Sequence, residues 1–289
     1  MHVLLKGLTV NDKLQIQPGT AQETLIIPLY ARKKCGDKFP ELYKDPAAAK
    51  ICDRLDYDFS ELDKKYDTAL YEFGALEGAM RQLDMMYEIN DYLRNRPNAS
   101  IVCLGCGLDL DTRRCGNQQN KIFNVDFPDV IAMREKLAGI DQRETNIVSD
   151  LTDLSWMDQV DARNGAVFYA AGVFHYLKKE NVKAIVLKMT ELFPGCRLVF
   201  DTVGTLGYKL MMRVILKKHG MNDFGNLFYT NNAVKDLSSW SDKISVSSKG
   251  YMLGYYDMKL PSIKGIHRLL AKMGDNIMHM QIVKIELLY

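Results

Sequence analysis

Hydrophobic positions recur at two different periods along the chain, and the change falls near Pro97. From about Asp67 to Leu93 they are spaced by three and four, which predicts one long amphipathic helix. Its apolar positions are Leu70, Phe73, Leu76, Met80, Leu83, Tyr87 and Ile89. A shorter helix is predicted over 46–56, because Asp45 suits an N-cap and Pro46 suits the first helical position. Residues 1–96 are therefore expected to form a helical N-terminal lid.

After Pro97, short apolar runs alternate with helical segments. Strands are predicted over 100–104, 121–126, 145–148, 166–171 and 198–203, with helices over 129–138 and 179–193. The second of these helices has the best amphipathic face, made of Val182, Ile185, Val186, Met189, Leu192 and Phe193. Such alternation predicts an α/β fold with a mostly parallel, doubly wound sheet.

The C-terminal part is less regular. Helices are predicted over 206–218 and 262–272, and strands over 244–252 and 278–289. That order suits a sheet that closes with an antiparallel pair. We therefore expect a second domain over 97–289, with a helical insertion at about 205–242 after the fifth strand.

Charge and composition narrow the class of protein. Lys and Arg number 38 and Asp and Glu 36, a net charge of +2, so no basic excess marks a nucleic-acid binder. The hydrophobic content of 47% is enough for a substantial core. No apolar run approaches the length of a membrane span, and the N-terminal run is interrupted by Lys6, which argues against a signal peptide. We expect a cytoplasmic protein with no membrane or nucleic-acid partner.

The cysteines are spaced in a way that raises the question of a metal. Cys103, Cys106 and Cys115 lie close together, but no histidine or fourth cysteine is near. Cys103 also falls within an apolar strand pattern, where a small hydrophobic side chain packs well. We expect reduced thiols and no metal.

A glycine turn follows the first strand of the second domain. The strand at 101–104 runs into Gly105-Cys106-Gly107, where two glycines allow a tight turn and close approach of the backbone to a ligand. Asp126 follows Gly107 by 19 residues, at the end of the next strand. At that spacing an acidic side chain can accept hydrogen bonds from a ribose. The pattern favours an adenosine-containing cofactor over the alternative, a tight turn without a ligand.

The residues after the turn favour S-adenosylmethionine over a nicotinamide dinucleotide. A dinucleotide motif needs a third glycine where this chain has Leu110. Asp109 and Asp111 would repel a pyrophosphate, whereas a cationic sulfonium tolerates acids beside the loop. A nicotinamide oxidoreductase stays as a weaker alternative.

The chain resembles the leucine carboxyl methyltransferase family, and within it the bacterial tetracenomycin-type O-methyltransferases. The matching segments are TLIIPLYAR (24–32), DPAA (45–48), LGCGLD (104–109), VDFPDVI (125–131), SDL (149–151), AGVFHYL (171–177) and FPG (193–195). They lie in order over roughly residues 24 to 202, and the tail beyond 205 matches only loosely. The resemblance implies the class I methyltransferase fold, a Rossmann-like doubly wound sheet, and S-adenosylmethionine as the cofactor.

The resemblance also implies roles for individual residues. Gly105, Cys106 and Gly107 would wrap the methionine part of the cofactor, and Asp126 would hold the ribose, with Phe127 beside it. Asp150 and Leu151 would line the adenine, and Arg81, with Arg32 assisting, would grip the methionine carboxylate. From the residues alone, the favoured interpretation of Arg81 is an exposed helix residue. For Asp150, the N-cap of a helical turn at 151–157 stands equally beside a ligand role.

Two departures from the family pattern affect the expected function. Members usually carry a glutamate in the cofactor pocket where this chain has Ala171. The branch that methylates a protein C terminus has an arginine where this chain has Thr152, so a small-molecule acceptor is favoured. We expect an O-methyltransferase that acts on a small-molecule hydroxyl or carboxylate, including that of a secondary metabolite. The alternative is a catalytically degenerate S-adenosylmethionine-binding protein, and the oligomeric state is expected to be a monomer or a homodimer.

Candidates for catalysis follow the fourth strand. A carboxylate acceptor needs no base, whereas a hydroxyl does, and His175 is a candidate base. The alternative is a histidine at a helix start that points into solvent. Tyr176 is the second candidate and would pack over the cofactor.

The acceptor pocket is expected between the lid and the insertion. The lid is rich in aromatic residues that either shape this pocket or attach the helices to the sheet, namely Tyr30, Phe39, Tyr43, Tyr57, Phe59, Tyr66, Tyr71 and Phe73. The insertion would supply the opposite wall from Met211, Met212, Met221, Phe224 and Phe228.

Overall fold

A seven-stranded sheet forms the centre of the protein. The computed structural model describes residues 13–16, 21–219 and 227–289. The strand order is β5-β4-β3-β6-β7-β9-β8, in which β9 pairs antiparallel with both β7 and β8 and the other pairs are parallel. The bounds are β3 (Ser100–Leu104), β4 (Ile122–Asp126), β5 (Glu144–Val148), β6 (Ala166–Ala170), β7 (Arg197–Thr202), β8 (Ile244–Gly250) and β9 (Gln281–Leu287). The predicted fold class is confirmed, and so is the prediction that the sheet ends in an antiparallel pair of strands.

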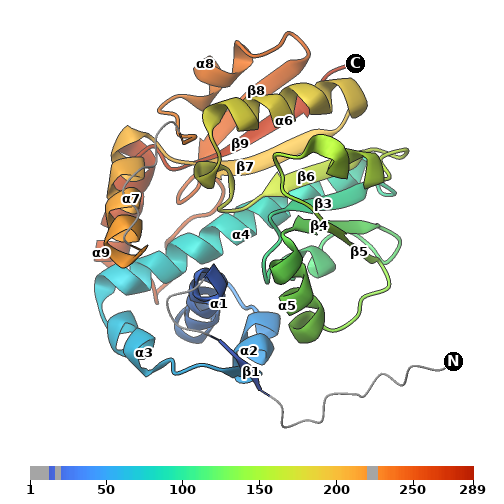
Figure 1. Ribbon diagram of the computed structural model, residues 1–289. Helices are drawn as coiled ribbons and strands as arrows, with labels where there is room; N and C mark the ends of the chain where they lie inside the picture. Colours follow the sequence, from blue (N-terminus) through green and yellow to red (C-terminus); the bar gives the residue numbers. More distant parts are fainter. Residues whose placement is uncertain (1–12, 17–20, 220–226) are drawn as a thin grey trace, which may run out of the picture.

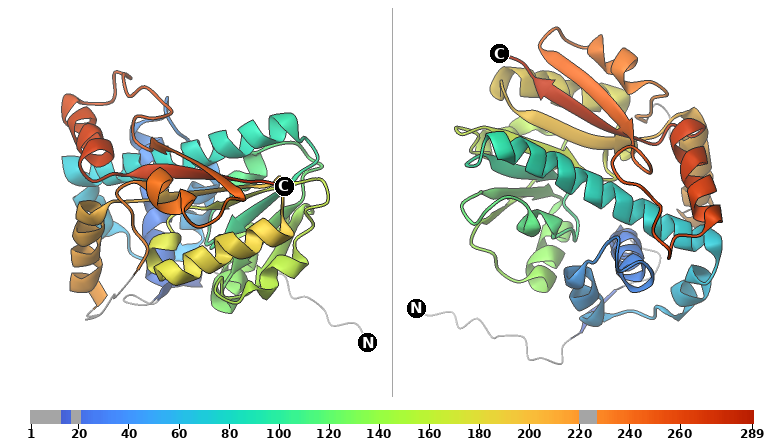
Figure 2. Two further views of the ribbon diagram at one scale, coloured as in Figure 1. Left: turned by 90° about the horizontal axis from the view of Figure 1, so that it is seen from above. Right: turned by 180° about the vertical axis from the view of Figure 1, so that it is seen from behind.

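Helices cover both faces of the sheet, as Figure 2 shows with the sheet seen edge-on. One face carries α4 (Ala69–Asn95) and α5 (Pro128–Ala138), and the other carries α6 (Lys179–Leu192), the short helix η2 (Leu154–Gln159) and α8 (Ala233–Ser238). Every residue of β3, β4, β6 and β7 is buried, because both faces are covered. The helices thereby leave the carboxyl ends of the parallel strands as the place for a site.

The N-terminal segment is helical, as predicted. It contains α1 (Ala21–Lys38), α2 (Pro46–Asp53) and α3 (Ser60–Tyr66), with a two-stranded sheet of β1 (Leu14–Gln15) and β2 (Leu55–Asp56) that the sequence did not indicate. Asp45 caps α2 by accepting from the backbone N–H of Ala48, as its sequence predicts.

Helix α4 connects the N-terminal helices to the sheet. It packs against α1 and also against β6 and β7, and it crosses the molecule diagonally in Figure 1. Helix α4 lies within residues 1–96 in the sequence, but it packs on the sheet of the second part as well as on α1. The division into a lid over 1–96 and a second domain over 97–289 therefore stays a prediction. Two of its predicted core positions are wrong: Leu70 is 68% exposed and Tyr87 is 41% exposed.

The C-terminal part contains α7 (Thr205–His219) and α9 (Gly265–Asn276), besides α8 and the last two strands. Of the residues expected to form one wall of the acceptor pocket, Met212 and Phe228 are buried, and Met221 and Phe224 lie outside the described residues. In the described part of the chain, no helix combines the length and apolar character of a membrane span.

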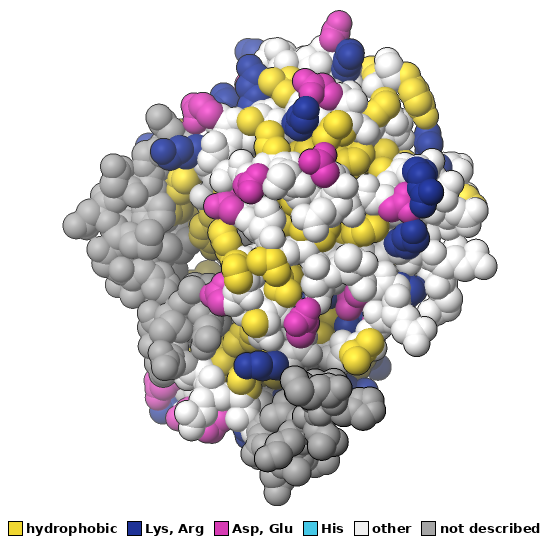
Figure 3. All heavy atoms as spheres, turned by 45° about the vertical axis from the view of Figure 1, so that its right-hand side comes forward, with side chains coloured by type: hydrophobic (Ala, Val, Ile, Leu, Met, Phe, Trp, Pro, Cys, Tyr) yellow, Lys and Arg dark blue, Asp and Glu magenta, His cyan; other side chains and the backbone are white. Residues whose placement is uncertain are grey.

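Surface charge is mixed on the face that Figure 3 shows. Lys and Arg side chains alternate there with Asp and Glu, in keeping with the near-neutral composition. A nucleic-acid interface would need a basic face instead.

Candidate functional site

The turn after β3 needs glycine for two reasons. Gly105 has a φ of 66° and Gly107 a φ of 47°, in the left-handed region that side chains with a Cβ rarely adopt. A Cβ at position 105 would also lie 2.6 Å from Cγ2 of Val173, which follows β6. The turn therefore lies tightly against the end of the neighbouring strand, at the carboxyl edge of the sheet.

Asp126 connects this turn to the end of β4. Its Oδ2 accepts from the backbone N–H of Gly107 at 2.8 Å, and its Oδ1 accepts from that of Phe127 at 2.8 Å. Burial raises the pKa of the Asp126 carboxyl, and the two N–H donors oppose that rise. Each carboxylate oxygen has a second lone pair, so a ribose hydroxyl can still be accepted here.

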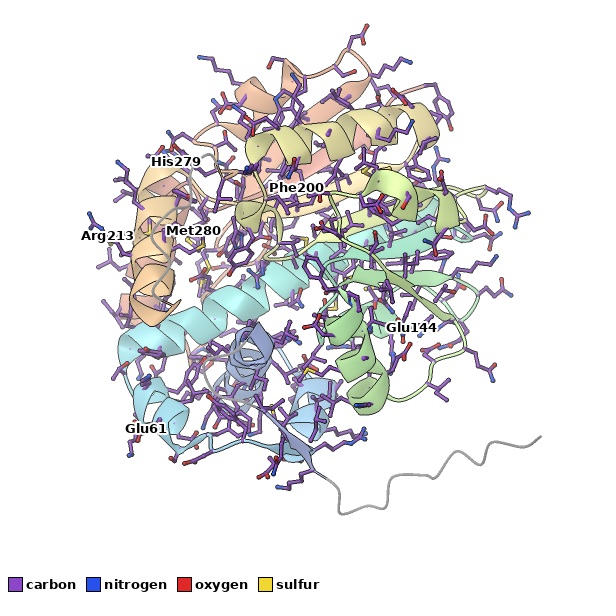
Figure 4. The ribbon with its side chains drawn as sticks, viewed as in Figure 1. Glu61, Glu144, Phe200, Arg213, His279 and Met280 are labelled. Carbon is purple, nitrogen blue, oxygen red and sulfur yellow. The ribbon has the colours of Figure 1, made fainter. Side chains whose placement is uncertain are left out.

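Arg134 binds the backbone of the glycine turn, a role that the sequence did not indicate. From α5 it donates to the carbonyls of Gly107 and Asp109, and its Nη2 lies 2.9 Å from Oε1 of Glu144 on β5. Figure 4 labels Glu144 beside α5. Arg134 sits at an ordinary helix position, so only its neighbours in space reveal the contact.

Asp109 and Asp111 are buried in the protein. Asp109 accepts from the hydroxyl of Tyr169 at 3.0 Å, and Asp111 accepts from that of Tyr43 at 2.8 Å. Burial raises the pKa of Asp111 to about 7, with Asp109 adding to the rise. Both acids that follow the glycine turn are therefore buried carboxyl groups that accept hydrogen bonds from tyrosines of other elements.

Arg32 belongs to the same buried network. Its Nε donates to Oδ2 of Asp45 at 2.9 Å. Burial works against its charge, but the nearby Asp109, Tyr43 and Asp45 outweigh burial and raise its pKa. Arg32 thus joins α1 to the cap of α2, and the Tyr43 hydroxyl links Asp45 to Asp111 after the glycine turn. The expected role of Arg32 as a second grip on the cofactor stays a prediction.

Arg81, on α4, reaches the carboxyl ends of β6 and β7. Its Nη1 is 3.3 Å from Oδ2 of Asp201 on β7, and the backbone N–H of Gly172 donates to Oδ1 of the same Asp201 at 2.6 Å. Ala171, which precedes Gly172, is half-buried at this place. Arg81 is therefore not the exposed helix residue that composition alone allowed.

The expected adenine side is more open. Phe127 exposes half of its surface beside Asp126, as an aromatic ring available to stack on a base would. Asp150 is exposed, and its Oδ1 accepts from the backbone N–H and the hydroxyl of Thr152. The predicted helical turn begins later, at Leu154, and Asp153 caps it instead of Asp150. Leu151 turns its side chain into the core.

The chain between β3 and β4 has no long helix. Among residues 105–121, all of which the structure describes, the helical piece is η1 (Asp111–Arg114). A dinucleotide site presents the N terminus of a helix to the pyrophosphate at this place. The site therefore suits an adenosine cofactor without a pyrophosphate, in agreement with the position of Leu110.

His175 and Tyr176 differ in their exposure. They lie in η3 (Phe174–Tyr176), with ring centroids 4.3 Å apart. His175 is buried, so the interpretation as a solvent-facing histidine is wrong. Burial lowers its pKa to about 4, with Asp201 opposing and Arg81 assisting that shift. Tyr176 is 53% exposed, so its ring is available to a ligand.

The cysteines are buried thiols. All six are free, and burial raises the pKa of the Cys106 thiol, which packs in the core. Cys106 can therefore contribute only its backbone to a ligand. Within the described ranges, no group of His, Cys, Asp and Glu side chains has an arrangement that could hold a metal.

The aromatic residues of the N-terminal segment mostly pack. Tyr30, Phe39, Tyr43, Tyr66 and Phe73 are buried, and Tyr30 stacks on Phe59 with centroids 4.3 Å apart. Tyr71 is the exposed member of this set. Two cavities of the described chain, of about 890 and 540 Å³, lie at the amino ends of β4 and β5 and beside β8, away from the glycine turn.

The sequence model of the leucine carboxyl methyltransferase family matches residues 30–190. A relative named tetracenomycin polyketide synthesis O-methyltransferase TcmP, from Streptomyces glaucescens, is 28% identical over 63% of this chain. That alignment spans 65% of the relative, slightly less than two thirds of its length. A second relative, the S-adenosyl-L-methionine-dependent methyltransferase dpfgK of Gibberella zeae, is 24% identical over 74% of this chain and 76% of its own.

Two solved structures share the fold. One, from Thermobifida fusca and assigned as a methyltransferase, has a TM-score of 0.59 at 13% identity, over 95% of this chain and 100% of the other. The other is a DUF574 family protein from Streptomyces avermitilis, with a TM-score of 0.57 at 11% identity, over 91% and 96% of the two chains. At this identity the likeness concerns the arrangement of helices and strands.

Proposed function

The chain belongs to the leucine carboxyl methyltransferase family of S-adenosylmethionine-dependent methyltransferases, and from that premise we propose that it methylates an oxygen of a small molecule. The observation that carries the proposal is the glycine turn tied to Asp126 at the carboxyl edge of the sheet. The acceptor oxygen belongs to a carboxylate or a hydroxyl, and a secondary metabolite is the natural class of acceptor. The name of the Streptomyces relative, a polyketide O-methyltransferase, supports that class.

The residues of the site fit S-adenosylmethionine. Asp126 would accept from the ribose, and Phe127, Asp150 and Leu151 would surround the adenine. Gly105, Cys106 and Gly107 would wrap the methionine part with their backbone, beside Ala171. Arg81 would bind its carboxylate from α4, and Arg32 would assist through the buried network.

The chain's own contribution to the reaction is alignment. When bound, S-adenosylmethionine would supply a sulfonium methyl group, whose carbon is open to in-line attack by an acceptor oxygen as the carbon–sulfur bond breaks. Alignment of the two partners accounts for much of the acceleration in such a step. Tyr176, exposed next to the site, would cover the reacting atoms and exclude water.

The protonation state of His175 limits the chemical classes of acceptor that the site could serve. With a pKa of about 4, the imidazole is uncharged at neutral pH and can accept a proton, but it is a weak base. A weak base removes a proton more readily from a phenol than from an alkyl alcohol, because the phenol is the stronger acid. A carboxylate needs no base. We therefore favour carboxylates and phenols as acceptors.

The departures at Ala171 and Thr152 favour a second candidate, a protein that binds the cofactor without turnover. Calorimetry with S-adenosylhomocysteine and a methyl-transfer assay on a panel of aromatic acids and phenols separate the two. Binding together with transfer to any member supports the enzyme. Binding without transfer across the panel supports the second candidate. Absence of binding contradicts both.

A further inference from the structure

Three elements that are far apart in the sequence meet at Asp201. The residue lies on β7 and is 4% exposed. Its Oδ2 is 3.3 Å from Nη1 of Arg81 on α4, which is 120 residues away in the chain. Its Oδ1 accepts at 2.6 Å from the backbone N–H of Gly172, just after β6. One carboxylate thus holds a cation from a helix and the backbone of the neighbouring strand end.

The guanidinium of Arg81 lies directly against the backbone of Gly172. A Cβ at position 172 would be 2.8 Å from Nη1 of Arg81 and 3.1 Å from its Cζ and Nη2, and the φ of Gly172 is 73°. Any side chain there would displace the guanidinium. Arg81 is therefore held on one side by Asp201 and on the other by a backbone surface that only glycine provides.

Arg81 keeps its charge and part of its surface. Burial works against the charge, but Asp201 first, and then Tyr251 and Glu77, outweigh burial and raise the pKa of the guanidinium. The side chain is 19% exposed. Its Nε is buried, with no hydrogen-bond partner in the described part of the chain. A charged fork of this kind suits a carboxylate ligand.

The latch formed by Arg81, Gly172 and Asp201 adjoins the glycine turn. Val173, the residue after Gly172, is the side chain that leaves no room for a Cβ at Gly105. The latch therefore lies at the end of the site where the methionine part of the cofactor is expected.

We propose that Asp201 is a positioning residue for the methionine end of the cofactor, an inference that rests on the function proposed above. Through its contacts with Arg81 and Gly172, Asp201 orients the guanidinium for the ligand carboxylate. It also balances the buried positive charge before a ligand arrives. Ala171 supplies no acid at the end of β6, and Asp201 supplies one from the adjacent strand.

The test compares two ligands that differ in their methionine end. S-adenosylhomocysteine has the amino-acid carboxylate, and 5′-methylthioadenosine lacks it. Calorimetry is expected to show that Asp201→Asn lowers the affinity for S-adenosylhomocysteine about tenfold or more, because a charged hydrogen-bond partner is lost. Its affinity for 5′-methylthioadenosine stays within about twofold, because the ribose and adenine contacts are untouched.

A double-mutant cycle shows whether Asp201 acts through Arg81. Arg81→Met is expected to lose S-adenosylhomocysteine affinity by itself, and adding Asp201→Asn to it is expected to cost little more. Additive losses would overturn the proposal, as would an equal effect of Asp201→Asn on both ligands, or no effect on either. Asp275→Asn is the matched control, because Asp275 also accepts from two backbone N–H groups but lies beside β8.

The remaining outcomes separate a failure of the proposed role of Asp201 from a failure of the proposed function. If Asp201→Asn does not fold, Asp201→Glu keeps the charge but shifts it by one methylene. That variant is expected to lower the affinity for S-adenosylhomocysteine more than the affinity for 5′-methylthioadenosine. An equal effect of that variant on both ligands would overturn the proposal. If the wild-type protein binds neither ligand, the proposed function fails. If it binds both and Arg81→Met changes neither affinity, only the role of the latch fails.

Discussion

Arg134 and Glu144 form an ion pair within the protein, with Nη2 and Oε1 2.9 Å apart. Their side chains are almost fully buried, at 1% and 8% exposure. The other end of the same guanidinium donates to the carbonyls of Gly107 and Asp109. The pair therefore connects β5, through α5, to the backbone of the glycine turn, and the shape of that turn depends on a charge beneath it.

Substitution Arg134→Met is expected to destabilise the protein by roughly 1.5–3 kcal/mol, because it removes the charged hydrogen bonds of Arg134 while Arg113 still pairs with the Glu144 carboxylate. Urea denaturation measures the loss. The control is Arg163→Met, since Arg163 is exposed and pairs with Asp161 at the surface. That change is expected to cost less than about 1 kcal/mol. Similar losses for the two variants would contradict the supporting role of Arg134.

Substitution Asp126→Ala is expected to lower the affinity for S-adenosylhomocysteine by about ten- to a hundredfold. The carboxylate accepts the N–H of Gly107 and would accept a ribose hydroxyl, and bonds to a charged acceptor are the stronger ones. Calorimetry measures the change, with Asp129→Ala on the exposed first turn of α5 as the control. An unchanged affinity would remove the ribose contact from the assignment.

The buried carboxyl group of Asp84 is expected to make the protein less stable as the pH rises. It lies fully buried on α4, and neither carboxylate oxygen has a hydrogen-bond partner within the described residues. Burial raises its pKa to about 9, and Asp275 and Glu88 add to the rise while Lys249 opposes it. The folded state thus retains a proton that the unfolded state loses near pH 4. This contribution is fully present below about pH 4 and is lost progressively as the pH approaches 9.

The variant Asp84→Asn removes that dependence, since the amide does not ionise. Urea denaturation at pH 5, 7 and 8.5 is expected to show the stability of the variant rising relative to that of the wild-type protein, by up to about 1.4 kcal/mol for each pH unit. A constant difference between the two proteins across this range would show that Asp84 is ionised in the folded state.

His175→Asn is expected to separate the two classes of acceptor. Transfer to a phenol should fall by about a hundredfold, because general-base assistance is lost, while transfer to a carboxylate stays within about twofold. In the wild-type protein the phenol reaction should decline as the pH falls through about 4, where the imidazole becomes protonated. Equal losses on both acceptors would assign His175 a structural role.

How far the sequence predicts the site depends on the distance along the chain over which each contact is made. The strand at 100–104, the turn at Gly105 and the cap at Asp45 were predicted because each depends on neighbours within a few residues. Arg134 and Asp201 gave no signal, since an arginine on a helix and an acid on a strand are ordinary. Their partners come from other elements, 27 and 120 residues away.

The sequence by itself determined the alternation of strands and helices, the glycine turn followed by Asp126, and the family. These are properties of local backbone preference and hydrophobic period, which neighbouring residues encode. Only the tertiary structure decided which charges face the site. The strand order brings Asp201 to Arg81 and Gly172, and the packing of α1 against α2 brings Arg32 to Asp45. Tyr43 and Tyr169 donate to the two acids after the turn. Burial then determines which of these groups stay charged, because its cost depends on partners that only the folded chain brings together.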